Sequence, residues 1–149
     1  MLSIKRILCP TDFSEPSGHA VATAGELALQ FGAEICVIHV LPVVGLPPSD
    51  PNFVLSVPEY ERLLHNDADE KLQAVARDLR GRQVRVTTLV ANGHAGHEIV
   101  RVAREENFDL IVIATQGQSR LEHVLFGSVA ERVVRLADRP VLSIPTRKH

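Results

Sequence analysis

Residues 109–145 read "DLIVIATQGQSRLEHVLFGSVAERVVRLADRPVLSIP" and contain the pattern that decides the fold. They begin within a continuously apolar run, "FDLIVIAT" (108–115), and continue through a polar loop, a helical segment from Ser128 to Ala137, and the short apolar run "RPVLSIP" (139–145). Continuous apolarity without alternation is typical of a strand covered on both faces, as in a parallel sheet. We therefore expect two strands joined by a crossover helix.

The preceding residues show the same alternation of strands and helices. Apolar runs predict three more strands, at residues 4–9, at "AEICVIHVL" (33–41) and at "RQVRVTTLVANG" (82–93). Helical spacing of apolar residues predicts three more helices, at residues 18–31, from Pro58 or Glu59 to Arg80, and over "GHAGHEIVRVAREEN" (93–107). Ser14 or Ser17 is a candidate cap for the first of these helices, and Gly32 fits the position just after its end.

Five strands alternating with four helices predict an α/β three-layer sandwich with a mostly parallel sheet and right-handed crossovers. The third strand alternates apolar and polar residues, which favours a place at the edge of the sheet. A chain of 149 residues is most economically a single domain, here residues 1–149. Residues 42–58 carry five prolines and are expected to form an excursion loop.

Composition and charge exclude several classes of function. The net charge of -2 argues against a nucleic-acid partner, which normally selects a basic surface. No apolar stretch approaches the roughly 18 residues that span a bilayer, and the first residues lack a signal-peptide core. Cys9 and Cys36 lie inside apolar runs, as small buried residues of a reducing compartment do. We expect a cytoplasmic protein with no membrane partner.

The loop between residues 114 and 128 has the features of a phosphate site. Gly117 and Gly127 are separated by nine residues, and Gly127 is followed by Ser128 and a helical segment. Glycine allows a backbone to approach a ligand closely, and a helix start offers unpaired N–H groups to an anion. The alternative is that Ser128 is simply the N-cap of the helix.

Asp12 is the second candidate, because it follows a strand that ends at Pro10. The loops after the first and fourth strands are expected to meet where ligands bind in open α/β sheets, beyond the carboxyl ends of the strands. A carboxylate there can accept hydrogen bonds from ribose or adenine, or help to hold Mg²⁺ beside phosphates. The alternative is a solvated turn aspartate or a helix cap.

Three segments together resemble the universal stress protein family: "ILCPTDFSEPS" (7–17), "GAEICVIHV" (32–40) and the stretch 109–145. The resemblance covers the chain from Ile7 to Pro145. The nucleotide-binding subclass of that family is marked by glycine, two residues, glycine, nine residues, then Gly-Ser or Gly-Thr. Here Ala114 stands at the first glycine, whereas Gly117 and Gly127-Ser128 match. Gln116 and Gln118 stand where the family often has histidine and a basic residue.

The resemblance implies a Rossmann-like fold, similar to adenine nucleotide alpha hydrolases, with strand order 3-2-1-4-5. It also implies ATP or a related adenine nucleotide as the ligand, together with Mg²⁺. The adenine would lie near Pro10, Thr11, Asp12 and the backbone of Val40, with Ile113 closing the pocket, and Asp12 and Ala114 would lie near the ribose. The residues around the phosphates would be Gly117, Gln118, Gly127, Ser128 and Val129.

The family further implies a stress-response or regulatory switch, a homodimer formed through the last strand (Pro140 to Pro145), and an unidentified regulatory protein partner. Two alternatives stay open: a stress protein that acts through dimeric protein–protein contacts without nucleotide, and a slow ATPase or autophosphorylating protein. The chain has no "GKS" or "GKT" and the loop has no lysine, so we expect a binding protein rather than an enzyme.

Two further chemistries are disfavoured by the sequence. A hydrolase built on Ser119 or Ser128 with His123 lacks the G-x-S-x-G elbow. Metal binding by His94 and His97 lacks companion ligands, and the "HAGH" segment is better interpreted as a solvated loop.

Overall fold

The computed structural model describes residues 2–43, 56–117 and 126–146. Its strands are β1 (Arg6–Pro10), β2 (Glu34–Leu41), β3 (Arg85–Asn92), β4 (Leu110–Ala114) and β5 (Val141–Ile144). Its helices are α1 (Glu15–Phe31), α2 (Val57–Gly81), α3 (Ala95–Glu105) and α4 (Ser128–Leu136). Most of the expected excursion loop, residues 44–55, lies outside the described residues.

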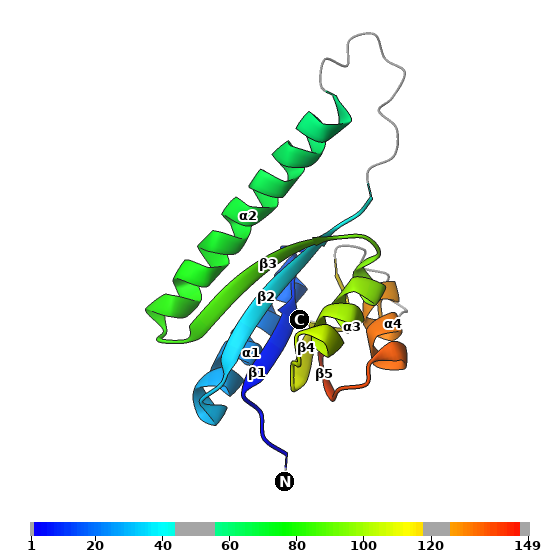
Figure 1. Cartoon of the computed structure of the whole chain (residues 1–149). Helices are drawn as coiled ribbons and strands as arrows, with labels where there is room; N and C mark the ends of the chain where they lie inside the picture. Colours follow the sequence, from blue (N-terminus) through cyan, green and yellow to red (C-terminus); the bar gives the residue numbers. More distant parts are fainter. Residues whose placement is uncertain (1, 44–55, 118–125, 147–149) are drawn as a thin grey trace.

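The strands form one sheet in the order β3-β2-β1-β4-β5, and every pair of neighbours is parallel. The α/β class and the strand order expected from the sequence are confirmed, and β3 lies at an edge, as its alternation indicates (Figure 1). β5 forms the other edge.

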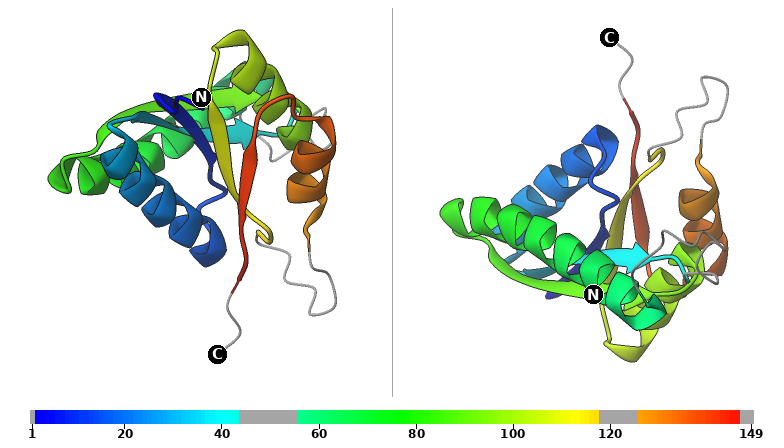
Figure 2. Two further views of the ribbon diagram at one scale, coloured as in Figure 1. Left: turned by 90° about the horizontal axis from the view of Figure 1, so that it is seen from below. Right: turned by 90° about the horizontal axis from the view of Figure 1, so that it is seen from above.

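Helices cover both faces of the sheet, as Figure 2 shows from below and from above. α1 and α2 pack on one face and α3 and α4 on the other. Side chains of successive strand residues point to opposite faces, so Ile7 enters the core under α1 and α2 while Leu8 enters the core under α3 and α4. This two-sided burial is the physical reason for the continuous apolar runs in the sequence.

Local capping chemistry sets the helix starts. Ser14 caps α1 and accepts a hydrogen bond from the Ser17 N–H, so the helix begins three residues before the expected Gly18. Gly32 ends the same helix in the left-handed region, with φ of 64°, as expected. Ser56 and Glu59 form a capping box at the start of α2.

The start of α3 corrects one expectation. His94 is the N-cap, so Gly96 and His97 belong to the helix instead of a solvated loop. A methyl group added at Gly96 would lie 2.8 Å from Cδ and 3.0 Å from Cβ of Arg132. Glycine at this position therefore lets α3 and α4 pack closely against each other.

Both cysteines are free and buried, as expected. Cys9 packs into the core under α1 and α2, and Cys36 into the core on the opposite face. Burial raises the pKa of both thiols, so they stay protonated and unreactive at neutral pH. Within the described residues, none of the helices is long and apolar enough to cross a membrane.

Candidate functional site

β1 loses its pairing with β4 before either strand ends. The β1–β4 register runs through Ile7–Leu110 and Leu8–Ile111 and stops there, whereas β1 stays paired with β2 as far as Pro10 and Ile38. The backbone N–H and C=O groups of successive strand residues point in turn to the neighbouring strand on one side and to the one on the other. The Thr11 N–H donates to the Ile38 carbonyl at 2.9 Å, on the β2 side, so Pro10 faces β4. Pro10 has no N–H, and the ladder cannot continue.

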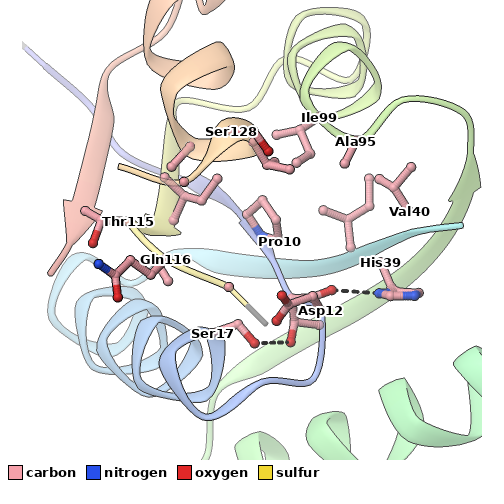
Figure 3. Close-up of a pocket in the computed structure, with 18 residues that line it drawn as sticks. Pro10, Asp12, Ser17, His39, Val40, Ala95, Ile99, Thr115, Gln116 and Ser128 are labelled. Carbon is pink, nitrogen blue, oxygen red and sulfur yellow. Dashed lines mark hydrogen bonds between the residues drawn. The ribbon is translucent and has the colours of Figure 1, made fainter. Parts of the chain in front are cut away.

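A cavity of about 340 Å³ opens beyond these strand ends (Figure 3). Ten of the eleven residues expected at the site line it: Pro10, Thr11, Asp12, Val40, Ile113, Ala114, Gly117, Gly127, Ser128 and Val129. The eleventh, Gln118, lies outside the described residues. Loops far apart in the sequence therefore meet at one place, where open α/β sheets bind ligands.

One part of the cavity is apolar. Pro10 and Val40 come from strand ends, Ile113 comes from β4, and Ala95 and Ile99 come from the first turns of α3. Such a surface suits a flat, weakly polar group.

Another part is built mainly from backbone. Gly127 is the N-cap of α4 and makes no side-chain cap, so Ser128 is the first helical residue and not the cap. The first N–H groups of a helix have no partner within it, and Ser128 and Val129 bring this end of α4 to the cavity. A methyl group added at Gly127 would lie 3.3 Å from the Thr115 carbonyl oxygen, which explains the need for a small residue here.

Asp12 lies against the glycine loop. Its Oδ1 accepts a hydrogen bond from the Ser14 N–H at 3.0 Å, which is a turn contact of the kind considered as the alternative. A methyl group added at Gly117 would lie only 2.4 Å from Asp12 Oδ2. Gly117 therefore leaves the space that the Asp12 carboxylate occupies beside the cavity.

Sequence reasoning missed several lining residues. They are Ser17, Ile38, His39, Ala95, Ile99, Thr115, Gln116 and Ala130. Three buried polar residues, Thr11, Ser17 and Thr115, all line this cavity, and the hydroxyls of Thr11 and Ser17 lie 3.0 Å apart. His39 carries a usable signal, because it interrupts the apolar run "ICVIHVL" (35–41) with an ionisable side chain.

His94 and His97 do not gather with a third metal-binding side chain from the part of the chain that the structure describes. The ring centroids of His94 and His97 lie 6.3 Å apart, and His97 contacts Arg132. Among the residues described, no three His, Cys, Asp or Glu side chains gather as a metal site. His123 and Ser119, considered for a hydrolase, lie outside the described residues.

Comparison with known protein families matches residues 3–145 to the universal stress protein family. The chain belongs to this family. Universal stress protein MJ0531 of Methanocaldococcus jannaschii is 37% identical over 147 residues, which cover 97% of this chain and 84% of that protein. The solved structure of MJ0577 from the same organism has a TM-score of 0.80 and 28% identity, and the match covers 99% of both chains.

A universal stress protein from Archaeoglobus fulgidus, solved in complex with dAMP, has a TM-score of 0.68 at 22% identity. The match covers 97% of this chain and 99% of that one. At this identity the likeness concerns the fold alone. The relatives thus agree on a universal stress protein fold over nearly the full length of the chain.

Proposed function

We propose that this universal stress protein binds ATP or a related adenine nucleotide in the cavity between the loops that follow β1 and β4. The observation that carries the proposal is the layout of the cavity. Val40 and Ile113 line an apolar region, while the first residues of α4 bring backbone N–H groups to the cavity. A nucleotide has the matching layout, with a flat base at one end and an anionic tail at the other.

The base would lie between Pro10, Ile99 and Ile113. The Ile38 carbonyl accepts from the Thr11 N–H, so the main-chain groups of Ile38 point from β2 toward β1. Val40 lies two residues further along β2, so its N–H and C=O point to the same side. β1 ends before reaching it. An N–H and a C=O on one residue match the adjacent acceptor and donor at the amino edge of adenine.

The phosphates would lie between Gly117 and Gly127, against Ser128 and Val129. Backbone N–H groups and the positive end of the α4 dipole favour an anion there. Among the described residues that line the cavity there is no lysine or arginine. We therefore propose binding through main-chain donors, and a regulatory protein rather than an enzyme of phosphoryl transfer.

Asp12 fits a role beside the ribose or a magnesium ion. Mg²⁺ usually keeps several waters and takes one or two carboxylates together with substrate phosphates. Asp12 brings a carboxylate to the cavity, and the absence of a three-ligand cluster in the described chain means that the nucleotide would supply the remaining ligands. Mg²⁺ would then neutralise phosphate charge that meets no lysine or arginine among the described lining residues.

The dAMP complex of the A. fulgidus protein is compatible with this proposal, since it pairs a similar fold with an adenine nucleotide. We propose that the loaded and empty states differ in the loops around the nucleotide, and that an unidentified regulatory partner distinguishes them. A homodimer formed through β5 would place two such sites in one assembly.

Calorimetric titration with Mg-ATP tests the function, together with the variant Gly127→Val and the control Gly18→Val. The wild-type protein is expected to bind ATP, and Gly127→Val to bind at least about tenfold more weakly, because the added side chain meets the Thr115 carbonyl and the donors of α4 move. A side chain at Gly18 meets nothing within 4 Å, so Gly18→Val should bind like wild type.

A wild-type protein that binds no adenine nucleotide would contradict the proposal, and so would equal affinity in Gly127→Val. Thermal unfolding of both variants shows whether each is folded during the titration.

A further inference from the structure

The pairing of β1 with β2 ends abruptly after Thr11. The Thr11 N–H donates to the Ile38 carbonyl at 2.9 Å, as the parallel register requires. In a continued ladder the next two bonds would run from the Val40 N–H to the Thr11 carbonyl and from the Phe13 N–H to the Val40 carbonyl. Neither bond forms between these described residues.

Other groups take both positions. The Thr11 carbonyl lies 2.8 Å from Nδ1 of His39, and because a carbonyl only accepts, Nδ1 carries the proton. The Phe13 N–H donates to the Thr11 hydroxyl at 3.1 Å. The imidazole of His39 therefore binds the same carbonyl that the Val40 N–H would bind in a continued ladder.

We propose that His39 is a positioning residue that keeps the main-chain edge of Val40 open for the ligand. This inference rests on the proposed function, since the open edge is the part that would hydrogen-bond the base. In this proposal the His39 bond holds the Thr11 carbonyl turned away from the Val40 N–H. Without that bond, the carbonyl turns to accept from Val40, and β1 extends its ladder into the space of the base. The role of His39 is exerted through Thr11, and the histidine makes no base contact in this proposal.

The surroundings hold His39 and the turn in this arrangement. The rings of His39 and Phe13 have centroids 4.5 Å apart, and Phe13 has a φ of 64°, a left-handed conformation that turns the chain away from β2. Thr11 is fixed from the other side, because its hydroxyl lies 3.0 Å from that of Ser17 at the start of α1.

The test compares His39→Leu, which removes the donor, with His39→Asn, which keeps one. The amide nitrogen of asparagine is attached to Cγ, as Nδ1 of histidine is. His19→Leu on the exposed side of α1 is the matched control. Affinities for Mg-ATP and for tripolyphosphate are measured by calorimetry, and hydrogen exchange of the Val40 amide is followed by NMR in the nucleotide-free protein.

We expect His39→Leu to lower ATP affinity about tenfold, the effect of losing one or two net hydrogen bonds to the base, and to leave tripolyphosphate affinity unchanged. His39→Asn should recover most of the ATP affinity, and His19→Leu should match wild type. In the nucleotide-free wild-type protein, the Val40 amide hydrogen should exchange quickly. In His39→Leu it should exchange at least about tenfold more slowly, because the Val40 N–H then donates a hydrogen bond to the Thr11 carbonyl.

The inference is overturned if the Val40 amide exchanges equally in wild type and His39→Leu. It is also overturned if ATP affinity does not change, or if ATP and tripolyphosphate affinities fall together, since that result indicates a general loss of structure. A wild-type protein that binds no nucleotide refutes the proposed function instead, and the exchange of Val40 still decides whether His39 holds the strand end open.

Discussion

Pro10 and His39 act on the same strand end from opposite sides. Pro10 lacks the N–H that would continue the ladder toward β4, and His39 takes the carbonyl of Thr11 that would continue the ladder toward β2. At the level where the cavity opens, β2 and β4 therefore have no pairing with β1, although they stay paired with β3 and β5. The site is the consequence of two interrupted ladders in an otherwise regular parallel sheet.

Ala114 stands where the nucleotide-binding subclass of the family has its first glycine, and its position shows where the added methyl group goes. The Thr115 N–H donates to the Ile144 carbonyl on the β5 side, so the main chain of Ala114 faces β1 and the cavity. Its methyl group belongs to the buried core under α1 and α2, where it is 8% exposed. The residue that replaces glycine thus adds its only side-chain atom mainly to the core.

At this scale the resemblance to universal stress proteins predicts eleven site residues, and ten of them line the cavity. His39, Ser17 and Thr115 also line it, but neither the glycine motif nor the resemblance pointed to them as site residues. Their placement depends on the register between strands and on the turn at Phe13, which a local pattern does not contain. Ser17 was recognised only as a possible helix cap, although it is buried beside Thr11.

The contact between α3 and α4 positions the end of the cavity at which we propose the phosphates bind. Gly96 lies directly against the side chain of Arg132, and α4 begins at the cavity with Ser128. We expect Gly96→Val to separate the two helices, to lower the free energy of unfolding by about 1–3 kcal/mol, and to weaken ATP and tripolyphosphate alike. Chemical denaturation and calorimetry measure the two effects.

This result would differ from that of His39→Leu, in which only the ligand with a base is affected. Gly18→Val is again the matched control, because a side chain there meets open space. Unchanged stability and affinities in Gly96→Val would mean that the α3–α4 contact does not hold the loop.

All nine elements were predicted in type and order, because each apolar run or helical periodicity is long enough to be recognised. Their ends were less accurate. α1 begins earlier than expected because the Ser14 side chain accepts a hydrogen bond from an N–H of the first turn. By residue type alone, Ser14 and Ser17 are equally suitable caps. The N-cap of α3 is His94, whose side chain makes no capping hydrogen bond, so the sequence contains no capping residue that would mark the start of this helix.

At the scale of the whole molecule, the described sheet has β3 and β5 as its edge strands. β5 is only four residues long, lies between Pro140 and Pro145, and leaves Leu142 38% exposed. An open strand edge with an apolar side chain is a surface that pairs readily with another strand. These features support the proposed homodimer through β5, in which each copy offers the same edge to the other.

We expect the wild-type protein to sediment as a dimer and Leu142→Asp to sediment as a monomer, because the charge would be buried at the seam. Leu29→Asp places the same charge on α1, where Leu29 is 51% exposed, and should remain dimeric. A Leu142→Asp dimer, or a monomeric wild type, would exclude β5 as the interface.

The strand order was available from the sequence through the resemblance to universal stress proteins, and the two-sided cores follow from continuous apolar runs. The sequence predicts a dimer only by that same resemblance. Assembly depends on complementarity between two surfaces, which the pattern of one chain does not reveal.

The most direct test of the central claim is a crystal structure of the protein grown with Mg-ATP. The base should lie between Pro10 and Ile113 with its amino edge on the main chain of Val40. The phosphates should lie between Gly117 and Gly127, on the main-chain groups of Ser128 and Val129. A nucleotide bound elsewhere, or one held by charged side chains instead of these main-chain groups, would contradict the account.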